Sequence, residues 1–450
     1  MRVVSIASLL LVVFALVASD AARISSAEPA FVFTVAKRYE PLAWMKGGER
    51  FSAGANIFIR GAHGRRPLVP NFAAAADPAV SFDGKSLLFA GKRAADDKWQ
   101  IWEMSLKQGD PTRITNCADD CIRPFYLPED RIVYAEKIDG RFVIQAMPIA
   151  GGKQLALTYE PASSLPTDVL RDGRVLFEAS FPLDAAGAMP ELYTVYSDGS
   201  GVESYRCDHG PARYSGKQVE SGDIVFVSQG RLARFTSARA TQVPISAPDG
   251  EFAGDVALTS SGDWLLPWRA NHNRQFELMW WNPGERTLRP AMEENGSDIV
   301  QPVLVAERPV PNRHPSGLHD WAVGNLLCLN AYTSKYKFAD ASIASVRLYT
   351  RTGSGDTQLL GAAPVEPDGS FFVQVTGDQP IQIELLDRAG KTLKREAGWF
   401  WLRRGEQRAC VGCHAGPETA PENAVPMTLL KSTTPADMTH PISSVAIGGH

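Results

Sequence analysis

The chain has 450 residues, of which 44% are hydrophobic and 21% are charged. This composition excludes an intrinsically disordered protein, and the length favours two or more domains. The formal net charge is only −4, and the basic residues are scattered without a run of four, so we expect no nucleic-acid partner.

The N-terminus has the pattern of a secretory signal. Met1 and Arg2 precede an apolar run, residues 3–18, which ends at small residues beginning with Ser19. We therefore expect a signal peptide over residues 1–22 and a mature protein that is periplasmic or secreted. The alternative is an uncleaved membrane anchor, for which the run is short because a span needs about 20 residues. No later segment is apolar enough for a stable membrane span.

A unit of roughly 40 residues recurs between residues 30 and 308, and its clearest copy covers residues 77–115. There the turn Asp83-Gly84 precedes an apolar run, residues 86–89. Asp-Gly before such a run indicates a hairpin, because both turn positions must accept a positive φ. Equivalent turns follow at Pro128-Glu129-Asp130, Asp172-Gly173, Ser221-Gly222-Asp223 and Ser261-Gly262-Asp263.

Repeats of this size that consist only of strands favour an all-β fold, a β-propeller. We expect six blades over residues 30–308, five complete and one split between the ends of the domain. The split blade would combine residues 31–34 and 56–60 with residues 299–305, which removes an exposed sheet edge. The repeats resemble the propeller of TolB-like proteins, in which the Asp-Gly-Lys turn and the apolar strand after it recur.

Two loops that join successive blades carry cysteines, and both are expected on the same face of the propeller. Cys117 and Cys121 in an exported chain predict a disulfide, with free thiols or a metal-binding pair as alternatives. Cys207, Asp208 and His209 bring together three groups that bind metals or transfer protons. This triplet is a candidate second metal site, and an ordinary loop with a buried cysteine is the alternative.

The last third of the chain begins with a Pro-rich linker, residues 309–320. Alternating strand-like runs over residues 321–405 then predict a small antiparallel β-sandwich. Cys328 is expected to be a buried strand residue, with a disulfide to Cys207 or a metal role beside the haem motif as alternatives. The aromatic run at residues 399–401 is expected to line a haem or to close the core of the sandwich.

The motif Cys-x-x-Cys-His at residues 410–414 is the attachment signal of c-type haem. Cys410 and Cys413 would bind one haem through thioether bonds, and His414 would bind the iron. We therefore expect a short monohaem attachment segment over residues 406–450. The ligand on the other side of the iron stays open, and its candidates are Glu418, Met427, Met438, His440 and His209.

The region before and through this motif resembles the haem-bearing middle region of the hydrazine synthase alpha-subunit family. The residues that carry the resemblance are Val365 to Phe371, the aromatic run 399–401, Gly405, Glu406 and the haem motif. The resemblance implies one covalent haem beside a propeller, and zinc as a second candidate cofactor bound by the motif histidine. The family places an iron-binding Tyr four residues after that histidine, where this chain has Glu418.

These observations predict an exported monohaem c-type protein that acts in electron transfer or as a subunit of a larger redox complex. One alternative is a haem-dependent oxidoreductase acting on a small, nitrogenous molecule, and another is a binding module with a structural haem. Its partner would be a redox protein or a small-molecule substrate. Hydrazine synthesis itself is not expected, because no second haem domain follows the motif.

Overall fold

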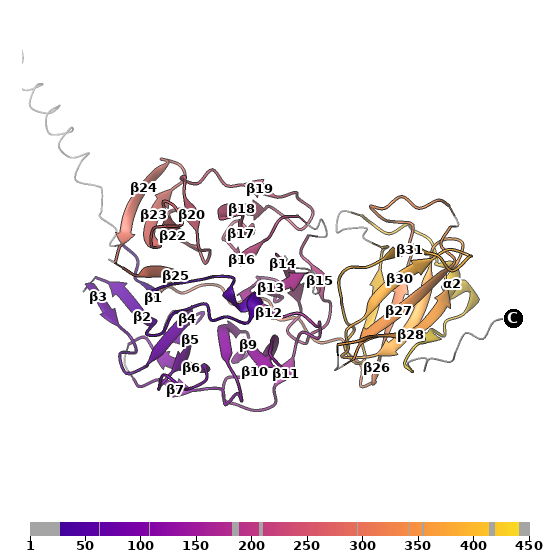
Figure 1. Ribbon diagram of the computed structural model, residues 1–450, viewed down its shortest axis with the longest axis horizontal. Coiled ribbons are helices and arrows are strands. Elements are labelled where there is room, and N and C mark those ends of the chain that lie inside the picture. Colours follow the sequence, from indigo (N-terminus) through magenta and orange to yellow (C-terminus); the bar gives the residue numbers. More distant parts are fainter. Residues whose placement is uncertain are drawn as a thin grey trace, which may run out of the picture.

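The computed structural model describes residues 28–62, 64–107, 109–181, 189–206, 210–294, 296–340, 342–352, 355–413 and 419–440. In these ranges the protein is all-β, as the sequence predicts, and consists of two units that lie side by side (Figure 1). The first is a ring of sheets of the propeller type. The second is a pair of sheets. The predicted signal peptide lies outside the described residues.

One sheet of the ring joins its two ends. Its strands, in spatial order, are β25 (Asp298–Leu304), β1 (Phe31–Ala36), β2 (Asn56–Gly61) and β3 (Gly64–Pro67). β25 pairs antiparallel with β1 from Asp298 opposite Ala36 to Leu304 opposite Phe31. The predicted pairing of residues 299–305 with the first strand is therefore confirmed.

The other sheets of the ring follow in chain order, and their paired strands are antiparallel. They contain β4 (Ala74–Val80), β5 (Ser86–Lys92), β6 (Gln100–Ser105) and β7 (Thr112–Arg113); β8 (Cys121–Leu127), β9 (Arg131–Ile138), β10 (Arg141–Pro148) and β11 (Leu155–Ala156); β12 (Ser164–Val169), β13 (Val175–Phe181), β14 (Met189–Val195) and β15 (Glu203–Ser204); β16 (Tyr214–Gln218), β17 (Ile224–Ser228), β18 (Arg231–Phe235) and β19 (Val243–Pro244); and β20 (Glu251–Phe252), β21 (Ala257–Leu258), β22 (Trp264–Arg269), β23 (Glu277–Asn282) and β24 (Thr287–Met292).

The predicted turns connect the first two long strands of these sheets. Gly84 between β4 and β5 has a φ of 71°, and Gly173 between β12 and β13 has a φ of 87°. The turn between β8 and β9 has no glycine, and Glu129 and Asp130 both adopt positive φ there, at 64° and 51°. Polar residues tolerate this conformation better than β-branched ones, which explains why this repeat works without Asp-Gly.

The second unit is built from two sheets. One contains β32 (Gln407–Cys410), β26 (Val323–Cys328), β29 (Phe371–Thr376) and β33 (Ala436–Asp437), and the other contains β28 (Thr357–Pro364), β27 (Ser345–Arg351), β30 (Gln382–Leu386) and β31 (Thr392–Arg395). Apolar side chains from both sheets form one core. Burial alternates along β27 and β29, as expected for strands with one packed face.

Within residues 321–405 the paired strands are antiparallel, as expected. Two parallel edge strands, which were not expected, are added to the first sheet. β32 pairs parallel with β26, and β33 pairs parallel with β29. Both edge strands come from the segment after residue 405, which therefore forms part of this sheet. A parallel neighbour needs a long crossover, and the sequence between β26 and β32 supplies one, since it includes the four strands of the other sheet.

The two units are joined by a buried contact. Trp401, 1% exposed, packs into an apolar cluster of the ring that includes Val133 and Phe177. Its indole N–H donates to the Gly199 carbonyl at 2.9 Å. Of the aromatic run, Trp401 therefore fills the junction with the ring, whereas Phe400 packs against the cores of both units.

Helices are few in the described part of the chain. They are the 3-10 helix η1 (Ala43–Lys46) and α2 (Met427–Lys431). Neither has the length that a helix needs to cross a bilayer.

Candidate functional site

The cysteine pair of the haem motif lies at the end of an edge strand. β32 ends at Cys410, which stands opposite Cys328, the last residue of β26. Cys413 follows after a bend, and both motif cysteines pack on the border of the core while staying half-buried. Neither is in a disulfide, so both thiols remain free for thioether bonds.

Gly412 allows the motif to lie close to the loop after β26. A Cβ atom at this position would collide with the carbonyl oxygens of Asn330 and Thr333. Any other residue at position 412 would therefore push the motif away from the loop. The sequence shows only that one of the two variable positions of the motif is glycine.

A third thiol lies beside the pair. A hydrogen bond with Cys413, together with burial, raises the pKa of Cys328. Burial also raises the pKa of Cys410. The neutral thiol form is therefore favoured at neutral pH. Cys328 is buried as the sequence predicts, whereas its contact with Cys413 depends on the parallel pairing of β26 with β32, which the sequence does not reveal.

Three segments close around the motif. A Cβ atom at Gly369 would meet Asn330 and Tyr332, so the turn before β29 packs directly on the loop after β26. The same turn caps α2, because the backbone N–H of Met427 donates to Asp368 Oδ2 at 2.7 Å. The loop, the turn and α2 thus form a connected surface, of which the loop lies against the motif.

The residues of this surface fit a covalently attached haem. Two large apolar side chains are exposed on its segments, Tyr336 on the loop at 41% and Leu430 on α2 at 71%. A haem bound through Cys410 and Cys413 would need apolar side chains of this kind to cover its macrocycle. The donor set, two accessible thiols at Cys-x-x-Cys spacing, has the chemistry that thioether attachment requires.

The predicted iron ligands lie in different surroundings. Met438 is 1% exposed and packs against Gly361 inside the core, so its sulfur does not face a haem on the surface. Met427 is half-buried at the start of α2, and His440 is exposed. The remaining predicted ligands, His414, Glu418 and His209, lie outside the described residues.

The other predicted sites are the cysteine pair and the Cys207 triplet in the loops of the ring. Cys117 and Cys121 form a disulfide whose Cα atoms are 6.3 Å apart. Together with Glu136 they are also the described group whose ligand atoms lie close enough to hold a metal, but the disulfide occupies both sulfur atoms. Cys207 and Asp208 lie, like His209, outside the described residues.

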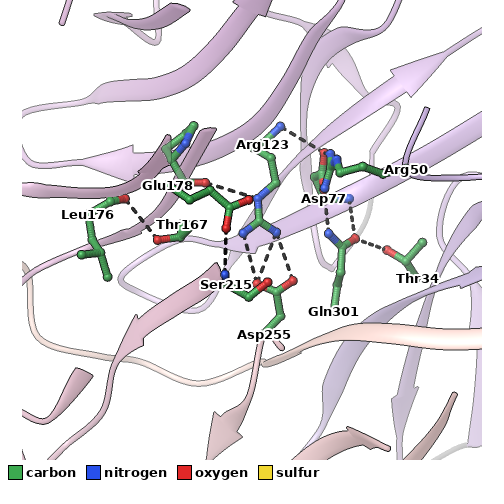
Figure 2. A network of polar contacts seen from close by, with 11 residues as sticks. Thr34, Arg50, Asp77, Arg123, Thr167, Leu176, Glu178, Ser215, Asp255 and Gln301 are labelled. Carbon is green, nitrogen blue, oxygen red and sulfur yellow. Dashed lines mark hydrogen bonds and ion pairs between the residues drawn. The ribbon is translucent and has the colours of Figure 1, made fainter. Parts of the chain in front are cut away.

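A set of polar residues that was not predicted from the sequence surrounds the axis of the ring. The innermost strands of neighbouring sheets contact one another around this axis, and each is interrupted by a bulge or break. A polar residue occupies every interruption. These six residues, here called the channel ring, are Asp77, Arg123, Thr167, Ser215, Asp255 and Gln301 (Figure 2).

Five members of the channel ring adopt positive φ, between 51° and 58°; Thr167 is the exception. Such values are uncommon for residues other than glycine, and they cluster at functional sites. β-Bulges re-aim side chains, and here they turn polar groups toward the axis. Gly254 is needed beside this ring, because a Cβ atom there would collide with the side chain of Ser215.

Ion pairs connect the channel ring. Asp77, 4% exposed, accepts hydrogen bonds from Arg50 at 3.0 and 2.5 Å and from Gln301 at 2.6 Å. The guanidinium of Arg123 donates to both oxygens of Asp255 at 3.1 to 3.2 Å. Burial alone would raise the pKa of Asp77, but the charge of Arg50 outweighs it and lowers that pKa. The Asp77 carboxylate therefore stays charged.

Glu178, which lies beside the channel ring, differs from Asp77 in the direction of its pKa shift. Burial raises the pKa of Glu178 to about 7, and its Oε2 accepts a hydrogen bond from the Ser215 backbone N–H at 2.8 Å. Figure 2 shows Glu178 beside the guanidinium of Arg123. A carboxyl group that titrates near neutral pH inside a charged network is typical of functional sites.

A sequence signal for the channel ring exists. Its members are spaced by 40 to 48 residues, in step with the repeat. Three of them, Asp77, Arg123 and Gln301, precede a proline within a strand, where proline is rare except at edges and bulges. A search for a polar residue before proline at the repeat spacing would have found half of the ring.

The second unit is similar in sequence to a known protein family. Residues 344–415 match a family model described as the hydrazine synthase alpha subunit middle domain. The hydrazine synthase subunit alpha of Kuenenia stuttgartiensis is 34% identical over 58 residues, which cover 13% of this chain and 7% of that protein. The matched segment is thus a small part of that relative.

Solved structures extend the likeness to both units. The structure titled Kuenenia stuttgartiensis hydrazine synthase matches 90% of this chain and 71% of its own, with a TM-score of 0.78 and 16% identity. TolB from Acinetobacter baumannii matches 61% of this chain and 66% of its own, with a TM-score of 0.44 and 14% identity. At 16% identity the first likeness concerns the fold. The comparisons confirm that this chain resembles the hydrazine synthase alpha-subunit family, and that residues 344–415 are similar to its middle domain.

Proposed function

We propose that this chain is an exported monohaem c-type protein that acts in electron transfer or as a subunit of a larger redox complex. The observation that carries the proposal is the pair Cys410 and Cys413, held as free, half-buried thiols on the edge of a sheet. The family match over residues 344–415 includes both cysteines. The likeness to the structure titled hydrazine synthase supports a place in a redox assembly.

The finer architecture belongs to the same proposal. The sheets of residues 30–308 are the blades of a six-bladed propeller, residues 309–320 are the linker, and the remainder is a sandwich that carries the haem. The signal peptide, residues 1–22, takes the chain to the periplasm or cell exterior, where haem is attached and the disulfide of Cys117 and Cys121 persists.

The bound haem would supply one-electron chemistry, with a potential set by its iron ligands and its burial. Cys410 and Cys413 hold it by thioether bonds, and His414 is the proposed ligand of the iron. The parallel pairing of β32 with β26 fixes the direction of the attachment strand. Gly412 seats the motif against the loop after β26, so that both sulfurs keep a constant position on the sheet edge.

A second candidate function is a haem-dependent oxidoreductase that acts on a small nitrogenous molecule. One observation favours it: Met438 is packed in the core, which removes one strong ligand from the open side of the iron. A weakly ligated iron would bind a small substrate, whereas two strong ligands favour electron transfer.

The experiment is production of the full chain together with a haem-attachment system, followed by intact-mass measurement and spectroscopy. We expect one covalent haem in the wild type and none in the Cys410→Ala, Cys413→Ala double variant. Cys328→Ala is the matched control, because it removes the neighbouring buried thiol and should keep the haem. A wild-type chain without covalent haem contradicts both candidate functions.

Carbon monoxide separates the two candidates. A low-spin ferrous form that does not react with carbon monoxide supports electron transfer and contradicts the oxidoreductase. A five-coordinate, high-spin form that binds carbon monoxide supports the oxidoreductase and contradicts simple electron transfer, because it shows an iron position open to a small molecule.

A further inference from the structure

A pocket lies at the axis of the first unit, and members of the channel ring line it. Part of its wall is apolar, formed by Pro78, Pro124 and Pro302, each of which directly follows a ring residue. These prolines cannot donate hydrogen bonds, so they form a collar with little polar character. The polar part of the wall includes Thr167 and the side chain of Lys217.

Lys217 is the cation of this pocket whose charge is not matched by a contact. In the described residues its ammonium group has no ion pair within 4.0 Å and no hydrogen bond. The other charged groups at the pocket form ion pairs: Arg123 pairs with Asp255, and Asp77 pairs with Arg50. Lys217 is half-buried, so its side chain reaches the pocket without being sealed from solvent.

The surroundings leave this ammonium short of stabilisation. Burial lowers the pKa of Lys217, and the nearby carboxylates of Asp168 and Asp255 do not reverse the shift. Asp168 instead accepts a hydrogen bond from the Gln218 backbone N–H at 2.8 Å. A cation beside apolar walls costs free energy unless an anion pairs with it.

Arg308, the residue before the linker, adds positive charge near the same pocket. It donates to the Val80 carbonyl at 3.1 Å, and its guanidinium lies over the Phe82 ring at 4.4 Å. Its charge acts on Lys217 in the direction that lowers the pKa of the amine. Two cations near one pocket increase the attraction for an anion.

We propose that this channel pocket binds a small organic carboxylate, with Lys217 as its cationic anchor and the proline collar packed against its apolar part. A monocarboxylate suits one ammonium group beside apolar walls. Inorganic phosphate suits it poorly, because its several oxygens require several donors, which the collar lacks. This site is separate from the haem segment and does not depend on the function proposed for it.

Binding is tested with the full-length holoprotein and butyrate as the probe, by titration calorimetry or ligand-observed NMR. We expect saturable binding of butyrate and a loss of affinity of about tenfold or more in Lys217→Gln, the effect of removing a hydrogen bond from a charged donor. Lys137→Gln is the matched control, because Lys137 is also half-buried but lines a different pocket of the ring.

A second measurement needs no variant. Acetylation of the wild-type protein, followed by peptide mass spectrometry, should show that butyrate slows the modification of Lys217 and leaves Lys137 unchanged. Phosphate at the same concentration should protect neither. Equal affinity of wild type and Lys217→Gln, equal protection by phosphate, or no protection at all would each overturn the proposal.

Discussion

Replacement of Trp401 by alanine should separate the two units of the protein. The side chain is 1% exposed, belongs to an apolar cluster of the ring, and donates a hydrogen bond to Gly199. Truncation of a buried tryptophan costs about 3 to 5 kcal/mol, because the transfer free energy is lost and a cavity remains. The Gly199 carbonyl also loses its donor, which adds about 1 kcal/mol. This loss falls on the contact between the units, since each unit keeps its own core.

The assay is thermal unfolding combined with limited proteolysis. The wild type should unfold with the second unit coupled to the ring, whereas Trp401→Ala should show a separate, earlier transition and faster cleavage between the units, at residues 309–320. Trp321→Ala is the control, because Trp321 is 50% exposed and its removal should cost less than about 1 kcal/mol. If both variants unfold and are cleaved alike, Trp401 does not couple the units.

Two further predictions concern the ring. The pKa of Glu178 is raised from 4.5 to about 7. Between these two pH values the folded state holds a proton that the unfolded state releases. The stabilisation that is fully present below pH 4.5 is therefore lost as the pH rises through 7. Glu178→Gln should remove about 3 kcal/mol of this pH dependence, measured as denaturant midpoints at pH 5 and 8, and an unchanged slope contradicts the assignment. Reduction of the disulfide between Cys117 and Cys121 should cost about 2 kcal/mol, the value for so short a loop, and thermal unfolding of the double alanine variant should not respond to the reductant.

The sequence predicts this fold where local chemistry determines the structure. Glycine at a hairpin turn is required by its φ, so the turns at Gly84 and Gly173 and the strands after them could be placed without coordinates. The closing sheet followed from the need to cover an edge strand, and the structure confirms the pairing of β25 with β1. These features depend on neighbours in sequence or on a general rule of sheets.

Features that depend on long-range pairing were missed. The contact of Cys328 with Cys413 exists because β32 joins β26 in parallel register, and no pattern in four residues specifies that partner. The channel ring has the same origin. Ser215 and Asp255 look like ordinary loop residues in the sequence, and they acquire a role only when the bulges bring them to the axis.

The carboxylate of Glu406 connects β32, the strand that ends in Cys410, to the ring. Glu406, 7% exposed, lies just before β32 and accepts hydrogen bonds from the backbone N–H of Arg403 at 2.7 Å and of Gly201 at 3.2 Å. Gly201 belongs to the turn between β14 and β15, so the ring itself contributes to the position of the strand that ends in Cys410. Arg403 adds a bond from its guanidinium to the Ala156 carbonyl at 2.7 Å, on the neighbouring sheet. A haem at this strand would therefore be positioned by two sheets of the ring as well as by the second unit.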